Sequence, residues 1–351
     1  MEALPALEPR PPSPGEGRNL RRRVDHSDRL IGQQGLDAKN YDHHLEGMIS
    51  LKQSVMWRVN IARRAALRAA HVGLNPLAGL LPKQGVSAVL CGRNDNYTPD
   101  FKERIDTCLD WAFANGLAEV IWVEWNPPEG VPLFAEDLTR RFPRLKAYVV
   151  SKRFHQEINE NPAFGLMEYH AKNVGIRRAS TDWICCTNAD IIWGPDVFPW
   201  FSMLRKNVVY QTQRVDFRWS GEPVTPALLS EGGRQLKRYR TDYIPIEGPG
   251  DFTLAHRMHW FKATGYDEAL RKQKRWCDDR GIHQLLAVGG RLARVGTIYH
   301  MDHANSSHHS TGAHHGIEFN PEAGLPYRNG ADWGLAGASQ RSIGERIWML
   351  E

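Results

Sequence analysis

The segment Glu168–Ile192, EYHAKNVGIRRASTDWICCTNADII, decides the fold class. Helical periodicity over 169–179 is followed by the apolar run Trp183–Thr187, which predicts a helix and then a buried strand. Directly after this strand comes the tripeptide Asn188–Asp190, so a carboxylate stands at the carboxyl end of a strand, where open α/β sheets bind ligands. A carboxylate there suits a hard divalent cation, although Asn-x-Asp tripeptides also form turns and caps.

Strands and helices alternate on both sides of this segment. Apolar runs predict strands at 86–91, 119–124 and 145–150, and 208–217 is also strand-like. Helical periodicity predicts helices at 101–115, 133–142 and 280–288. Repeated strand–helix units of this length predict an α/β domain, Rossmann-like, with a mainly parallel sheet flanked by helices.

Composition and charge exclude several classes of protein. The 351-residue chain is 41% hydrophobic and has a net charge of +5, with acidic and basic residues interspersed, which argues against a nucleic-acid binder. It has no run of eighteen apolar residues, so we expect no membrane-spanning helix. The N-terminus has no apolar signal region and the 5 cysteines form no CxxC pair, which favours a cytoplasmic chain with reduced thiols.

The N-terminal region differs in composition from the rest. Residues 1–20 are rich in Pro, Gly and charge, which predicts a disordered tail, and 21–84 predict a basic helical extension and linker. Its helical stretch, 41–72, has five basic residues and no acidic one over 51–72. It therefore either contacts a membrane surface as a peripheral helix or packs on the main domain or a partner. We expect the main domain over 85–310 and a C-terminal tail, 311–351, packed on it.

Later motifs carry a family resemblance. The segments that carry it are AVLCGRNDNY (88–97), AKNVGIRRA…TNADI (171–191), GDFTLAHRMHWFKATGYDE (250–268), RWCDDRGIHQLLAVGG (275–290) and TIYHMDH (297–303). In this order and spacing, over roughly 85–305, they resemble the nucleotide-sugar-binding half of GT-A glycosyltransferases, notably inverting family 2 and galactosyltransferase C-terminal-like enzymes. The resemblance implies transfer of a sugar from a nucleoside-diphosphate sugar, UDP-linked, to a hydroxyl of a glycan or lipid acceptor, assisted by Mn²⁺ or Mg²⁺.

The resemblance also implies which residues bind the nucleotide. Residues Arg93, Asn94 and Asp95 follow the first strand and correspond to positions that touch the nucleotide. Glu124, at the end of the second strand, would accept a hydrogen bond from a uracil imide, or it caps the turn before Asn126.

The diphosphate end is expected at the helix and strand of the segment 168–192. Lys172 and Asn173 would offset phosphate charge and fix the ribose. The family usually carries Asp-x-Asp where this chain has Asn188 and Asp190. Asn188 would hydrogen-bond the ribose or a metal-bound water, with one negative charge fewer.

The expected metal ligands are Asp190 together with a later histidine. His300 follows an apolar strand and is the first choice, and His303 is the second. Both belong to a run with six histidines between 300 and 315, which is either a polar loop that closes over the nucleotide or a zinc site, although no cysteine partner supports zinc.

The acidic pair Asp278–Asp279 would supply the general base of an inverting transfer, with Asp279 preferred. One member of the pair also suits the N-cap of the following helix. The aromatic residues Trp260, Tyr266 and Trp276 either stack on sugar rings or belong to the core.

Two other functions share this pattern of elements. A nucleotidyltransferase that makes the activated sugar would begin with a Gly-rich loop, but the first loop of this chain, GRNDNY, has one glycine. A non-catalytic nucleotide-sugar-binding module would fit the missing carboxylate at Asn188, whereas Asp190, the acidic pair and His300 favour an enzyme.

Overall fold

A computed structural model describes residues 81–238, 251–271, 277–304 and 328–351, except for the side chains of 277–279. The chain divides into the units Met1–His71 and Val72–Glu351, and all of the described residues belong to the second unit. The predicted tail and the basic helix of 41–72 lie outside the described residues.

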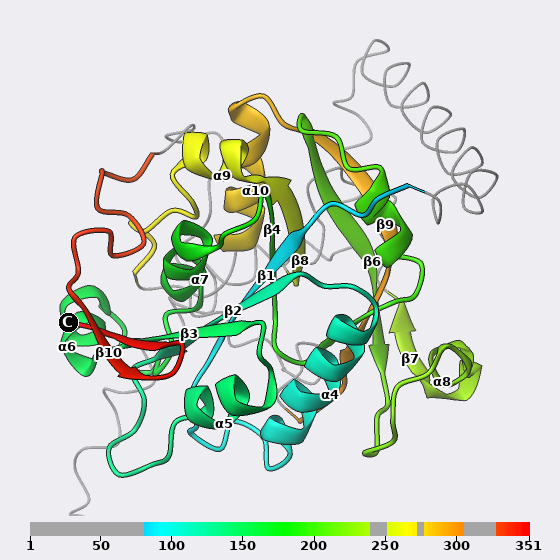
Figure 1. Cartoon of the computed structure of the whole chain (residues 1–351), viewed down its shortest axis with the longest axis horizontal. Helices are drawn as coiled ribbons and strands as arrows, with labels where there is room; N and C mark the ends of the chain where they lie inside the picture. The colour runs from blue at the N-terminus through cyan, green and yellow to red at the C-terminus, as the bar shows by residue number, and fades with distance from the viewer. Residues whose placement is uncertain (1–80, 239–250, 272–276, 305–327) are drawn as a thin grey trace, which may run out of the picture. The chain divides into compact units, whose positions relative to one another are not determined.

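Helices and strands alternate along the first half of this unit (Figure 1). It contains β1 (Val86–Gly92), α4 (Phe101–Ala114), β2 (Glu119–Trp125), α5 (Phe134–Arg141), β3 (Leu145–Val150), α6 (Lys152–Ile158), α7 (Glu168–Arg178), β4 (Trp183–Thr187) and β5 (Ile191–Trp193). The second half contains η1 (Phe198–Ser202), β6 (Val208–Phe217), α8 (Pro226–Ser230), η2 (Gly232–Arg234), β7 (Gln235–Arg238), β8 (Phe252–His256), α9 (Arg257–Ala263), α10 (Cys277–Ala287), β9 (Arg291–Met301), β10 (Gln340–Gly344) and β11 (Ile347–Leu350).

The described strands form one sheet in the order β10-β11-β3-β2-β1-β4-β8-β6-β9-β5, with β7 beside β6. Strands β1, β2, β3 and β4 pair in parallel, as the alternation of strands and helices predicted. The α/β class is therefore confirmed.

Beyond β4 the sheet also contains antiparallel pairs. Strand β8 is antiparallel to both β4 and β6, and β5 is antiparallel to β9. Only the three residues 188–190 separate β4 from β5, too few for the crossover that parallel neighbours need. The chain therefore leaves β4 and pairs β5 with β9 at the far edge.

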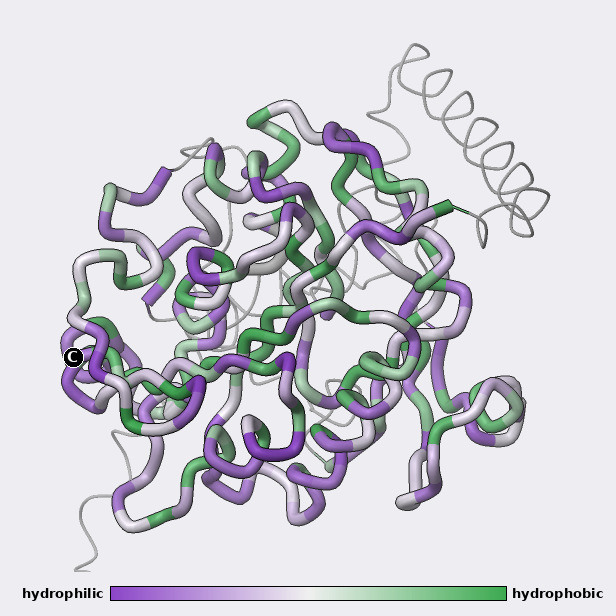
Figure 2. The backbone as a smooth tube through the Cα atoms, viewed as in Figure 1, coloured by the Kyte–Doolittle hydropathy of each residue, from purple (hydrophilic) through white to green (hydrophobic). Residues whose placement is uncertain are grey.

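Side chains that alternate along the central strands bury both faces of the sheet. On β1, Ala88 and Leu90 pack with α4 and α5, whereas Val89 and Cys91 pack with α7, α9 and α10. Helices α4 and α5 therefore cover one face and α7, α9 and α10 the other (Figure 1). Hydrophobic residues are concentrated on the strands between these layers (Figure 2), as expected for strands buried on both faces.

The C-terminal residues extend the sheet. Strand β11 pairs in parallel with β3, and Trp348 stacks on Tyr148 with ring centroids 5.1 Å apart. Arg178 donates hydrogen bonds to the carbonyl oxygens of Gly334 and Leu335, which hold the segment before β10 on α7. Among the described residues, no helix is long and apolar enough to cross a bilayer.

Candidate functional site

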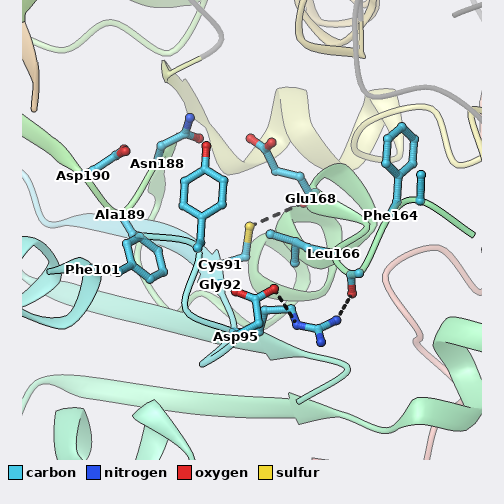
Figure 3. Close-up of a pocket in the computed structure, with 14 residues that line it drawn as sticks. Cys91, Gly92, Asp95, Phe101, Phe164, Leu166, Glu168, Asn188, Ala189 and Asp190 are labelled. Atoms are coloured by element: carbon cyan, nitrogen blue, oxygen red, sulfur yellow. Dashed lines mark hydrogen bonds and ion pairs between the residues drawn. The ribbon is translucent and has the colours of Figure 1, made fainter. Parts of the chain in front are cut away.

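A cavity of about 280 Å³ opens where β1 and β4 end. It is lined by Cys91, Gly92, Arg93, Asp95, Tyr97, Phe101, Ala163, Phe164, Gly165, Leu166, Glu168, Asn188, Ala189 and Asp190. Figure 3 shows Asn188 and Asp190 together at one side of the cavity and Phe164 at the other. The carboxyl ends of parallel strands are where such sheets bind ligands, and the segment 168–192 does contribute to this cavity.

Three predicted metal ligands meet at the edge of this cavity. The Oδ2 atom of Asp190 lies 3.1 Å from Nε2 of His303 and 3.4 Å from Nε2 of His300. One ligand atom from each residue falls within 4.8 Å of the others. Asp190 precedes β5 and His300 lies on the neighbouring β9, so the pairing of these strands brings the two residues together.

The charges of this cluster depend on one another. Burial opposes ionisation of Asp190, but His300 and His303 hold the pKa of this carboxyl well below its usual range. Burial alone would lower the pKa of His300, whereas the carboxylates of Asp190 and Asp216 raise it to about 9. In the metal-free protein, His300 is therefore protonated near neutral pH and pairs with these two carboxylates.

The cluster has the ligand types and spacing of a divalent-metal site. Neighbouring ligand atoms around an ion with bonds of about 2.1 Å are roughly 3.0–3.5 Å apart. The two distances from Asp190, 3.1 and 3.4 Å, lie in this range. Two imidazoles and one carboxylate favour a transition ion over Mg²⁺, which prefers oxygen ligands.

The predicted nucleotide-binding residues after β1 lie along the wall of the cavity or beside it. Arg93 donates to the carbonyl oxygen of Gly165 at 2.6 Å and pairs with Asp95 at 3.0 Å. Asn94 instead donates to the carbonyl oxygen of Pro132 and does not line the cavity. Tyr97, which the sequence did not single out, lines the cavity, and its ring centroid lies 5.3 Å from that of His303.

Lys172 and Asn188 lie next to each other, but the lysine does not line the cavity. Its fully buried ammonium donates to Glu168 at 2.7 Å and to Oδ1 of Asn188 at 2.9 Å. Burial opposes this charge, but Glu168 keeps the pKa of Lys172 above its ordinary value. Lys172 therefore acts on the cavity through Glu168 and Asn188, both of which line it.

Two predicted nucleotide-binding residues make contacts within the fold. Glu124 is fully buried and accepts hydrogen bonds from the backbone N–H groups of Phe134 and Ala135 at the start of α5. This is a capping role, although the cap is that of α5 and not of the turn before Asn126. Asn173 donates to Tyr266 and Glu268 and accepts from Tyr266. Neither residue lines the cavity.

The predicted stacking residues Trp260 and Tyr266 are fully buried in the core beside α7 and α10. They expose no ring face to a sugar, because α9 and the turn after it direct them inward, so the core alternative holds for both. Trp276 lies outside the described residues. Asp278 and Asp279 are in the first turn of α10, but their side chains also lie outside the described part.

The sequence did not identify the polar residues behind the cluster. These are Glu168, Arg214, Asp216 and Asp251, which are joined to it through hydrogen bonds and ion pairs. Asp216 had a usable signal. It lies near the carboxyl end of the predicted strand 208–217, and the strand-end criterion that selected Asp190 applies to it as well.

Comparisons with known proteins found similarity to solved structures alone. No family model matches the chain, and no curated protein matches its sequence. Among solved structures, the chain is similar to GalNAc-T7 with UDP, GalNAc and Mn²⁺ (14% identity, TM-score 0.41, 63% of this chain and 43% of that one). It is also similar to the mannosyltransferase PcManGT from Pyrobaculum calidifontis in complex with GDP-Man and Mn²⁺ (16%, 0.44, 70% of each chain) and to S. aureus TarS (9%, 0.39, 63% and 37%).

The chain thus spans less than half the length of GalNAc-T7 and of TarS. Because these TM-scores are below 0.5, the function is argued below from the residues of this chain alone.

Proposed function

We propose that this chain is a GT-A glycosyltransferase that uses a nucleoside-diphosphate sugar and a divalent cation, Mn²⁺ by preference. The observation that carries the proposal is the cluster of Asp190, His300 and His303 at the edge of a cavity formed where parallel strands end. An ion held there would neutralise charge on a diphosphate leaving group.

The chain's own residues suit the remaining parts of such a donor. Arg93 and Asp95 lie along the same cavity and would contact the nucleotide. Glu168 lines it as well, and its carboxylate can accept hydrogen bonds from hydroxyl groups while Lys172 balances its charge. UDP is proposed as the nucleotide of the donor because of the resemblance in the sequence motifs.

The transfer itself needs a base on the acceptor side. We assign this role to Asp279, with Asp278 beside it at the start of α10, so that a carboxylate takes the proton of the incoming hydroxyl and the configuration is inverted. The proposed acceptor is a hydroxyl of a glycan or lipid. Peripheral membrane contact through 41–72 would bring the chain to such an acceptor.

The test is a screen of nucleotide sugars for hydrolysis by the full chain with Mn²⁺, which needs no acceptor. We expect release of a nucleoside diphosphate that EDTA abolishes. Asp190→Asn should weaken Mn²⁺ binding, whereas Asp279→Asn should abolish turnover and leave nucleotide binding intact. A matched control is Asp196→Asn, which removes an exposed carboxylate bonded to Thr297 on β9.

The proposal would be overturned if Mn²⁺, with or without any nucleoside diphosphate, left the melting temperature of the chain unchanged. A base other than Asp279 would be required if Asp279→Asn kept its turnover.

A further inference from the structure

His300 lies between two carboxylates that come from different strands. In the register of the sheet its strand partners are Ile191 on β5 and Asp216 on β6. Its Nε2 lies 3.4 Å from Oδ2 of Asp190, and its Nδ1 lies 3.2 Å from Oδ1 of Asp216. The two ring nitrogens therefore lie near different groups, Nε2 near Asp190 and Nδ1 near Asp216; the Nδ1 contact in this structure is an ion-pair distance and not a formed hydrogen bond.

Asp216 is itself firmly held. It is fully buried, and Arg214, two residues earlier on β6, approaches its Oδ1 with Nε at 2.9 Å and a terminal nitrogen at 2.8 Å. Residues two apart on a strand point to the same face, which explains how both reach the site. Charge-assisted hydrogen bonds of this kind hold a buried carboxylate in position.

The same guanidinium joins Asp216 to the other half of the site. Arg214 also pairs with Asp251, the residue before β8, and Asp251 accepts a hydrogen bond from Nδ2 of Asn188 at 2.8 Å. A continuous polar network thus runs from Asn188 through Asp251, Arg214 and Asp216 to His300. Because His300 contacts Asp190, this network links Asn188 and Asp190, the two ends of the tripeptide 188–190.

We propose that Asp216 is a positioning residue for His300. The carboxylate of Asp216 would accept a hydrogen bond from Nδ1–H of His300, so that the lone pair of Nε2 is free on the side of Asp190, where the cation would be held. A neutral imidazole carries one N–H, and the group that receives it decides which nitrogen is free to bind a metal. Arg214 and Asp251 keep the accepting oxygen in place. The assignment rests on the proposed function, since it concerns the metal site of that proposal.

The test compares Mn²⁺ affinity by titration calorimetry, without nucleotide, in the full wild-type chain and in two variants at this position. Asp216→Ala removes the acceptor, and we expect affinity to fall about 10- to 100-fold, as for other residues behind metal-bound histidines. Asp216→Asn keeps an acceptor oxygen and should recover most of the affinity. This recovery distinguishes orientation of the imidazole from loss of a buried charge, because both variants lose the charge.

The matched control is Asp196→Ala, which removes a carboxylate bonded to β9 at Thr297, away from His300. It should bind Mn²⁺ as tightly as the wild type. Circular dichroism and melting without metal establish that each variant folds, and Asp216→Leu, which also removes the acceptor but fills the space, replaces the alanine variant if that variant does not fold.

Three results would overturn the assignment. Asp216→Ala could bind Mn²⁺ as tightly as the control, or Asp216→Asn could bind as weakly as the alanine variant; either would leave the proposed function standing. If the wild-type chain itself bound no Mn²⁺, the proposed function would fail together with this assignment.

Discussion

Asn188 occupies a position where the resemblance leads us to expect an aspartate. The neighbours of Asn188 explain why an amide suits this position. Lys172 can only donate and the carboxylate of Asp251 can only accept, so the amide must turn its oxygen to the lysine and its nitrogen to the aspartate. An aspartate at position 188 would place a second carboxylate against Asp251. The negative charge missing from the tripeptide is thus present one strand away, at Asp251.

We therefore expect Asn188→Asp to destabilise the metal-free chain by about 2 kcal/mol, the cost of losing a charge-assisted hydrogen bond. The double variant Asn188→Asp with Asp251→Asn exchanges the two groups and should restore stability, because the amide now at position 251 can donate to the carboxylate at position 188 and accept from Arg214. Urea unfolding with EDTA present measures both. If the double variant were less stable than either single variant, the amide at position 188 would have a different role.

The residues of the site differ in how far the sequence could predict them. The proximity of Asp190 and His300 could be predicted from the sequence, because each residue stands at the end of a predicted strand and strand ends share an edge of the sheet. It could not show that Trp260 faces the core or that Asn173 bonds to Tyr266, because these contacts join segments distant in sequence. Residue type alone does not give the direction in which a side chain points.

At the scale of elements, length and periodicity decided what could be predicted. The bounds predicted for β3, β4 and β6 are confirmed. Strand β5 has three residues and α6 has seven, too few to show a period, and neither was predicted. The pairing of β8 with β4 depends on tertiary contacts that the sequence does not display.

The packing of α7 on β1 depends on Gly175. A Cβ added there would lie 2.3 Å from Cγ1 of Val89 and 3.4 Å from Cγ2 of Val123. Alanine would gain about 1 kcal/mol in helix propensity, but overpacking of a core costs roughly 1–3 kcal/mol. A contact at 2.3 Å forces α7 or the valine to move, so we expect the steric cost to exceed the gain.

Gly175→Ala should therefore lower the free energy of unfolding by about 1 kcal/mol or more, measured in urea. Val89→Ala opens space at this contact, and adding it to Gly175→Ala should cost less than the sum of the two single changes. Additive effects would show that Val89 is not what the new methyl group meets. Because α7 carries Glu168 and Lys172, the same variant should also weaken nucleotide binding.

For the whole molecule, pH-dependent stability combines two buried groups with opposite effects. Burial raises the pKa of Glu124 to about 7 from an ordinary value of 4.5, although its backbone hydrogen bonds oppose the shift. Burial lowers the pKa of His170 to about 4 from 6.5, against its hydrogen bond to Glu268. Glu124 lies under α5 and His170 in α7, on opposite faces of the sheet.

The signs follow from where each state binds its proton. Between pH 4.5 and 7 the folded state holds a proton on Glu124 that the unfolded chain has lost, so this group makes the protein less stable as pH rises. Between pH 4 and 6.5 the unfolded chain protonates His170 and the folded state does not, so this group makes the protein less stable as pH falls. Each effect amounts to about 3 kcal/mol over its window, and the two offset each other where the windows overlap.

Replacing either residue should reveal the pH dependence of stability that the other residue causes. Relative to the wild type, Glu124→Gln should gain stability as pH rises from 4.5 to 7, whereas His170→Gln, which keeps a donor for Glu268, should gain stability as pH falls from 6.5 to 4. Urea unfolding of the three chains at half-unit pH steps measures these differences, in which contributions from other groups cancel. Differences that stayed constant with pH would mean that neither group changes its pKa on folding. The prediction would also be wrong if the two differences changed with pH in the same direction. A carboxyl gains its charge as pH rises and an imidazole gains its charge as pH falls, so burial of the two groups must affect stability in opposite ways.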